Sequence, residues 1–166
     1  LLGGCGWISP PHQDLGYPID AYPIDEAEVI RVIDGDTVDL RLDGSEERVR
    51  LIGIDTPESV SRTTPDQCWG AEASQALGHL LPTGTVVRVE RDIEARDRYG
   101  RLLLYVHRSS DDLFVNQWMV QEGFAEVASY PPNDTFERHF AAVRNEARRQ
   151  NLGLWAHCDG PDQPLD

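Results

Sequence analysis

The chain has 166 residues and a formal net charge of -14, and all 15 of its basic residues are arginine. That length predicts one domain with a sizeable hydrophobic core, and no apolar run is long enough to cross a bilayer. Binding of nucleic acid depends on cationic contacts with phosphate. The charge therefore excludes a broad basic surface, and a nucleic-acid partner would require a local positive site, a bound metal or screening salt. Acidic surfaces are common in salt-adapted proteins, and codon bias explains the missing lysines equally well.

Residues 1–26 predict a linker or tether, because prolines and glycines interrupt them and no helical or strand period survives. The run from Leu2 to Cys5 is similar to a lipoprotein signal-peptidase site, in which Cys5 would carry lipid and tether the protein to a membrane. The alternative is a chance cysteine in a flexible tail. No Met begins the chain, so we expect that an upstream segment has been removed.

We expect the folded domain to span 27–158, with a short tail over 159–166. Residues 28–33 and 36–42 are rich in Val, Ile and Leu, which predicts two strands. Asp43-Gly44 then predicts a hairpin turn, because glycine tolerates the positive φ that such turns require.

The returning strand is predicted over 47–54, where alternation places Arg50 on the face opposite Val49 and Leu51. The polar, irregular residues 59–68 predict a surface loop beside the end of this strand. Apolar periodicity and stop signals predict the elements that follow. They are a helix over 71–81, a strand over 85–91, a charged turn over 94–100, a strand over 101–107, a helix over 114–121 and a helix from a capping box at Asp134–Glu137 to Arg149.

Two of these helices have a clear apolar face that predicts contact with the core. The expected inner residues are Ala73, Ala76, Leu77, Leu80 and Leu81 in one helix, and Phe136, Phe140, Val143 and Ala147 in the other. Three strands, a helix, two strands and two helices predict an α+β fold in which helices pack on a small barrel.

Acidic residues are grouped at two strand ends, with Asp34 and Asp36 at one and Asp55 and Glu58 at the other. Calcium takes about six to eight oxygen ligands from carboxylates, backbone carbonyls and water. Asp36 and Asp55 would converge if their strands are neighbours, and the carbonyl of Thr56 could join them. Most of the 29 acidic residues must be solvated surface charges, so only the grouping singles out this set. No cluster of Cys and His has zinc spacing.

Two arginines predict a phosphate site near these acids. Arg50 is flanked by apolar residues, and Arg101 follows Tyr99-Gly100 at a strand start. A guanidinium matches phosphate oxygens in a bidentate manner, and two of them with a divalent ion can neutralise the charge that develops on a pentacoordinate phosphate. Glu58 is then placed to activate or orient a water.

Seven motifs, taken in order, resemble the staphylococcal nuclease (thermonuclease) family. They are I-D-G-D-T-V-D-L, R-L-I-G-I-D-T-P-E, W-G-A-E-A, D-R-Y-G-R-L, F-V-N-Q-W-M-V-Q-E-G-F-A-E-V-A, P-N-D-T-F-E and N-L-G-L-W. The resemblance covers about 27–155 and implies a five-stranded OB-fold β-barrel with three α-helices. Any one motif is weak, but the ordered set is specific.

The resemblance implies a Ca²⁺-dependent nuclease that cleaves DNA and RNA at the 5′ side of the phosphodiester and leaves 3′-phosphate ends. The implied roles are as follows: Asp36, Asp55 and the Thr56 carbonyl bind Ca²⁺; Asp34 supports that site; Glu58 activates water; Arg50 and Arg101 clamp the phosphate; Asp97, Arg98, Tyr99 and Tyr130 contact the substrate. Single-stranded or denatured substrate and a monomeric enzyme are expected. Ser129 stands where family members often have a second tyrosine, and the 59–68 loop carries only Arg62 where lysines are common.

Related bacterial sequences often carry cysteines at the places of Cys68 and Cys158, which suggests a disulfide between them. The alternative is two free thiols in a cytosolic protein. Disulfides persist outside the cytoplasm, so we expect a protein that is secreted or anchored to the outer face of the cell membrane.

Two other functions fit the fold. One is a catalytically inactive nucleic-acid-binding module of the same fold, which would lack Glu58, Arg50 or Arg101; all three are present. The other is a plain OB binding barrel with a halophilic surface, which leaves the grouped carboxylates unexplained.

Overall fold

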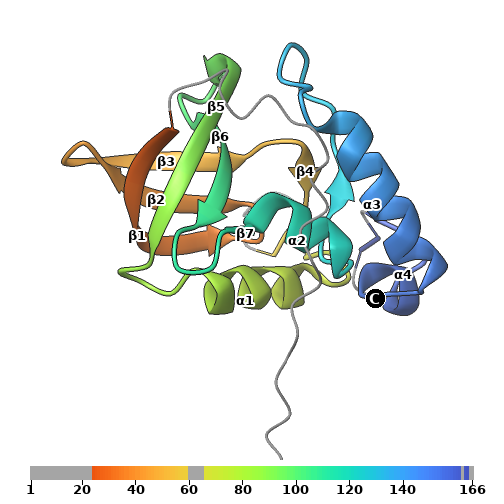
Figure 1. Cartoon of the computed structure of the whole chain (residues 1–166). Helices are drawn as coiled ribbons and strands as arrows, with labels where there is room; N and C mark the ends of the chain where they lie inside the picture. The colour runs from red at the N-terminus through yellow and green to blue at the C-terminus, as the bar shows by residue number, and fades with distance from the viewer. Residues whose placement is uncertain (1–23, 60–65, 162, 165–166) are drawn as a thin grey trace, which may run out of the picture.

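A closed, mixed β-barrel of five strands forms the centre of the molecule (Figure 1). The computed structural model describes residues 24–59, 66–161 and 163–164. The barrel strands are β1 (Ile24–Asp34), β2 (Thr37–Leu42), β3 (Ser45–Leu51), β5 (Val86–Arg96) and β6 (Leu102–Arg108). β1, β2 and β3 form an antiparallel meander, β1 also pairs with β5, and β5 pairs with β6. β6 then lies parallel to β3, which closes the barrel and confirms the predicted OB-type α+β fold.

The predicted turn between β2 and β3 is present at Asp43 and Gly44. Both residues have positive φ, 50° and 80° respectively, which is the geometry of the tightest hairpin turns. The register that follows places Arg50 opposite Thr37 and Arg48 opposite Asp39. This turn therefore decides which charged side chains of the two strands meet.

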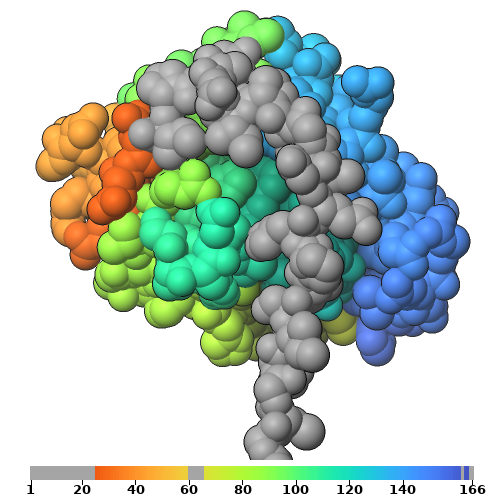
Figure 2. All heavy atoms as spheres, in the orientation of Figure 1, coloured from red at the N-terminus to blue at the C-terminus, as the bar shows by residue number. Residues whose placement is uncertain are grey.

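Helices cover one end and one side of the barrel (Figure 1). They are α1 (Gly70–Leu80), α2 (Val115–Gln121), α3 (Glu137–Arg149) and a short α4 (Leu154–His157). The three longer ones correspond to the predicted helices, and α4 is an addition. Short strands join these layers: β4 (Ile54–Asp55) pairs with β8 (Glu126–Val127), and β7 (Leu113–Phe114) pairs with β6. Figure 2 shows the β2–β3 strands and α3 at opposite sides of one continuous body.

The core lies inside the barrel and under α1, α2 and α3. The predicted inner faces are buried at Ala73, Leu77, Leu80, Leu81, Phe136, Phe140 and Ala147, and Ala76 and Val143 are partly buried against them. One polar side chain, Asn116 of α2, is fully buried among them. It donates to Ile52 O at 3.0 Å and accepts from Val106 N at 2.9 Å, so it fixes the bend that follows β3. No helix of the described residues is both long enough and apolar enough to span a membrane.

The predicted capping box at Asp134 is wrong, because α3 begins at Glu137 and no side chain caps its first turn. The preceding residues bind β5 instead. Thr135 donates through N and Oγ1 to the buried carboxylate of Asp92, at 3.2 and 3.1 Å, and Asn133 exchanges hydrogen bonds with the backbone of Glu94. A buried carboxylate must be hydrogen-bonded, so these tertiary contacts outweigh a local cap.

Three other boundaries differ from expectation. β1 begins at Ile24, inside the segment predicted as a tether, and the predicted strand over 47–54 divides at a turn into β3 and β4. β5 continues to Arg96, through part of the predicted charged turn, because Arg96 forms a bidentate pair with Glu47 of β3 at 2.8 and 2.9 Å. Charge composition alone therefore misplaced the end of this strand.

Candidate active site

The turn between β1 and β2 positions Asp36 beside the segment that follows β4. Thr56 donates to Asp36 Oδ2 through both N and Oγ1, at 3.2 Å each, and Thr37 Oγ1 donates to Oδ1 at 2.9 Å. This approach requires Gly35, because a Cβ on that residue would lie 2.6 Å from Thr56 Oγ1. The I-D-G-D-T motif thus brings residues 36 and 56 together, although they are distant in sequence.

Arg50 joins the two acidic groups and is 4% exposed. Its Nη1 donates to Leu51 O at 2.8 Å and Ile54 O at 2.9 Å, which fixes the guanidinium on the backbone. Its Nη2 lies 3.0 Å from Asp36 Oδ2 and 2.6 Å from Asp55 Oδ1. The predicted pair of carboxylates therefore meets at one positively charged group, although alternation alone would not have buried Arg50 next to the equally buried Val49 and Leu51.

Asp34 is held behind this pair by three donors. Gly35 N, Ser59 Oγ and Ser74 Oγ all lie within 3.0 Å of its Oδ1. Ser59 comes from the segment that follows β4, and Ser74 comes from α1. Neither was predicted from the sequence, and only the small residue on the inner side of the helix could have suggested Ser74.

Glu58 lies at the open side of the cluster. Partial burial raises the pKa of its carboxyl, and the negative charges of Asp34 and Asp36 raise it further, whereas Arg50 and Arg101 act in the opposite direction. The charges of both acids and both arginines thus act on this one carboxylate. Glu58 is therefore under the influence of residues from three other segments: the β1–β2 turn, β3 and the turn between β5 and β6.

Arg101 projects from a turn between β5 and β6 that Asp97 organises. Asp97 accepts from the backbone of Tyr99 and Arg101 at 2.9 Å each, and from Arg101 Nε at 2.7 Å. Partial burial acts to raise the pKa of Asp97, but the hydrogen bonds and charge of Arg101 outweigh it and hold that pKa below its usual range. The contact is made through Nε, so the tip of the guanidinium extends beyond it.

Two tyrosines flank the arginines in different ways. Tyr99 is 68% exposed, and the guanidinium groups of Arg98 and Arg101 lie 4.7 and 5.5 Å from its ring centre. Tyr130 is half-buried; its hydroxyl accepts from Arg50 Nη2 at 2.9 Å, and burial raises the pKa of its phenol. Tyr130 is therefore protonated at neutral pH and part of the arginine cluster, while Tyr99 presents an open aromatic face.

The donor chemistry of this cluster fits a hard divalent cation. Asp36 and Asp55 supply carboxylate oxygens that already converge on one positive charge, and the backbone N–H of Thr56, the third residue of the predicted set, donates to Asp36. Within the described part of the chain, no group of three or more His, Cys, Asp or Glu side chains is arranged to hold a metal ion. The predicted set needs only two carboxylates, since a carbonyl and water complete the shell of Ca²⁺.

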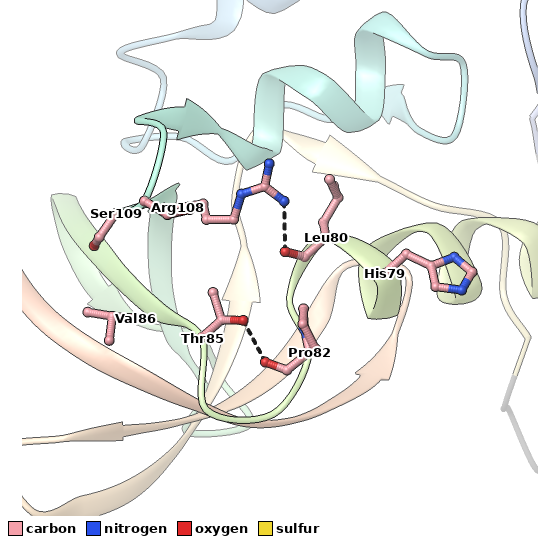
Figure 3. A pocket seen from close by; sticks show the side chains of 8 residues that line it. His79, Leu80, Pro82, Thr85, Val86, Arg108 and Ser109 are labelled. Atoms are coloured by element: carbon pink, nitrogen blue, oxygen red, sulfur yellow. Dashed lines mark hydrogen bonds between the residues drawn. The ribbon is translucent and has the colours of Figure 1, made fainter.

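Cys68 and Cys158 form the expected disulfide, which joins the start of α1 to the end of α4. Cys5, the possible lipid site, and Arg62 lie outside the described residues. A hollow of about 550 Å³ lies elsewhere, between the end of α1 and the edge of β5 and β6 (Figure 3). Its one arginine, Arg108, is bound to Leu80 O and to Asp111, and none of the predicted site residues lines it.

Comparison with known proteins agrees with this arrangement. A family model described as staphylococcal nuclease homologue matches residues 48–157. The chain is 45% identical over 127 residues to a thermonuclease of Staphylococcus intermedius, covering 76% of this chain and 74% of that protein. It is 38% identical over 130 residues to a thermonuclease of Staphylococcus hyicus, covering 78% and 75%. It is also 34% identical over 127 residues to a prophage-derived endonuclease of Bacillus subtilis strain 168, covering 76% and 42%.

Proposed function

The chain belongs to the family of staphylococcal nuclease homologues and is a nuclease, and we propose that it is a Ca²⁺-dependent enzyme that hydrolyses both DNA and RNA. In the proposed reaction water attacks phosphorus, the bond from phosphorus to the 5′ oxygen breaks, and a 3′-phosphate end remains. The observation that carries the proposal is the convergence of Asp36 and Asp55 on Arg50, with Glu58 in the field of both.

Asp36, Asp55 and the Thr56 carbonyl would hold the ion. Nucleases of this family depend on a metal, and the all-oxygen donor set favours Ca²⁺ over a softer ion. Bound there, the ion would neutralise charge on the scissile phosphate and help to orient it. Asp34, held by two serines and a backbone amide, would keep the β1–β2 turn and therefore Asp36 in place.

Glu58 would accept the proton of the attacking water. A carboxylate is a better base at neutral pH when its pKa is raised, and its neighbours Asp34 and Asp36 act in that direction. Arg50 and Arg101 would hold the phosphate oxygens and stabilise the charge that develops on them. The anchoring of Arg50 Nη1 on two carbonyls and of Arg101 Nε on Asp97 supports this role, because it holds each guanidinium in place before the substrate binds.

The substrate chain would cross Tyr99 and Tyr130. The exposed ring of Tyr99, with Arg98 beside it, offers stacking and charge to a nucleotide, while Asp97 keeps that turn in shape. A single strand can bend toward the cluster more easily than a duplex, so single-stranded or denatured substrate would be favoured. Because no broad basic surface surrounds the site in a chain of net charge -14, most of the substrate affinity would come from these few groups.

We place the enzyme outside the cytoplasm, in secreted or membrane-tethered form, and expect a monomer. The disulfide supports this location, because such bonds persist in oxidising compartments. The inactive binding module is not supported, because the residues whose loss would define it are present and the chain resembles thermonucleases over most of its length.

Calcium dependence is the direct test. Cleavage of denatured DNA and of RNA should rise with Ca²⁺ over the millimolar range and stop when a chelator is added. A second measurement should find that Ca²⁺ raises the unfolding temperature of the wild type and not of Asp36→Asn. Equal cleavage in chelator would refute the calcium requirement, and products with 5′-phosphate ends would refute the proposed bond.

A further inference from the structure

We propose that Gln67 is a positioning residue that sets the place of the Glu58 carboxylate; this inference rests on the catalytic role proposed for Glu58. Gln67 lies nine residues farther along the chain, just before α1, and is half-buried. No motif in the sequence pointed to it. Its side chain and its backbone N–H both form hydrogen bonds with the backbone of Glu58.

Gln67 forms hydrogen bonds with both the backbone N–H and the backbone C=O of Glu58. Its side-chain Oε1 accepts the Glu58 N–H at 2.7 Å, and its own N–H donates to Glu58 O at 2.8 Å. The two hydrogen bonds close a ring that fixes both the donor and the acceptor of one residue. Glu58 lies in no helix or strand, so no regular backbone pairing performs this function for it.

Gly70, the first residue of α1, lies close against the backbone of Glu58. A Cβ at that position would lie 2.6 Å from Glu58 O and 2.9 Å from Pro57 O. Because these distances are so short, the peptide has little freedom to move toward α1. Glu58 is therefore held between the side chain of Gln67 and the first residue of the helix.

Gln67 itself is anchored to the C-terminal part of the chain. It forms a β-bridge with Pro164, and the next residue, Cys68, donates its N–H to Gln163 O at 2.8 Å and forms the disulfide with Cys158. Trp69 stacks on His157 with ring centres 4.4 Å apart. These contacts hold the backbone of Gln67 in place, which lets its side chain fix the position of Glu58.

The experiment compares Gln67→Met, which keeps the length but loses the acceptor, with Gln67→Glu, which keeps an oxygen for the Glu58 N–H. Gln67→Met should lower kcat by about tenfold to a hundredfold with KM changed less than about twofold. Gln67→Glu should restore most of the turnover. Gln150→Met, at the exposed end of α3, is the matched control and should leave kcat unchanged.

Two further readouts separate positioning from general stability. Hydrogen exchange of the Glu58 amide should quicken in Gln67→Met while the barrel amides keep their protection. In a Glu58→Gln background, Gln67→Met should cost less than about twofold in kcat, because Gln67 acts only through the Glu58 carboxylate. If Gln67→Met does not fold, Gln67→Asn, whose amide is too short to reach, takes its place.

Each outcome decides one question. An unchanged kcat in Gln67→Met, or an equal loss with and without the Glu58 carboxylate, would overturn the inference alone. If Glu58→Gln retains the wild-type rate, then the proposed base is wrong and the inference fails together with it.

Discussion

Two clusters of acidic residues and arginines each include one arginine of β3, Arg48 in one and Arg50 in the other, and they differ in charge balance. In the barrel cluster, defined by Asp39, Arg48 and Arg31 with Glu46, two guanidinium groups meet two carboxylates. In the site cluster, Arg50 and Arg101 face Asp34, Asp36, Asp55 and Glu58, and Arg101 is also shared with Asp97.

This difference in charge balance separates a structural cluster from the proposed active site. The barrel cluster is neutral and local: Asp39 and Arg48 are direct cross-strand partners, with the carboxylate 2% exposed. The site cluster is rich in negative charge and collects its members from strand ends and turns far apart in the sequence. Such an excess is costly unless a cation offsets it, which supports the proposal that the site cluster binds a divalent ion; the balanced charges of the barrel cluster need none.

The largest expected effect comes from the two proposed catalytic side chains. Glu58→Gln and Arg101→Ala should each lower kcat by about a thousandfold or more, because they remove the base and a donor to the developing charge. Turnover of denatured DNA is the measurement, and the unfolding temperature should change little. Wild-type turnover in both variants would mean that the site cluster is not catalytic.

Loss of the disulfide should have the next largest effect, and on stability. Replacing Cys68 and Cys158 together by serine removes a link between residues 90 positions apart, which costs about 4 kcal/mol in the chain-entropy account. Urea unfolding measures the free energy. Turnover should also fall, because Cys68 adjoins Gln67, whereas the ion pairs of the barrel cluster should be unaffected. A loss of unfolding free energy below about 1 kcal/mol would contradict this expectation.

The barrel cluster should respond in the opposite way to the site cluster. Asp39→Asn removes the carboxylate that Arg48 and Arg31 share, but both arginines are about half exposed, so solvent screening limits the loss to about 1 kcal/mol. The free energy of unfolding should fall by that amount while kcat changes less than about twofold. A large loss of turnover would remove the functional distinction between the clusters.

The smallest expected effect is a change in the free energy of unfolding at low pH. The hydrogen bond from Arg48, opposed by burial and reinforced by the charges of Arg48 and Arg31, holds the pKa of Asp39 below its ordinary 3.8. A lowered pKa in the folded state means that this stabilisation is complete above about pH 4 and is lost as the pH falls through the folded pKa. The difference in unfolding free energy between wild type and Asp39→Asn should therefore narrow between pH 6 and pH 3, and a constant difference would contradict the assignment.

The sequence predicted best what depends on neighbouring residues. Asp43-Gly44 specifies its turn through backbone preference alone, and the buried face of α1 follows from helical spacing. Arg48 and Arg50 are two positions apart on one strand, and nothing local says that one is 50% exposed and the other 4%. That outcome depends on Tyr130 and Ile54, which only the closed fold brings to Arg50.

The same reason explains the residues that the sequence did not reveal. Ser74 binds Asp34 from forty residues away, and Gln67 binds a backbone group, so neither carries a pattern of its own. The family resemblance predicted which acids and arginines to choose. It did not predict what holds them, because support comes from polar groups of ordinary type in positions that packing decides.

The bridge between Gln67 and Pro164 has a consequence for how the protein is made. Every side chain proposed to touch metal, water or phosphate lies between Asp36 and Tyr130, but the contacts that brace Gln67 come from 157–164, which a ribosome adds afterwards. A nascent chain that already contains the complete barrel therefore still lacks the contacts that hold Gln67, and through it Glu58, in place. During synthesis the barrel is therefore complete before the contacts that hold the proposed catalytic glutamate in place can form.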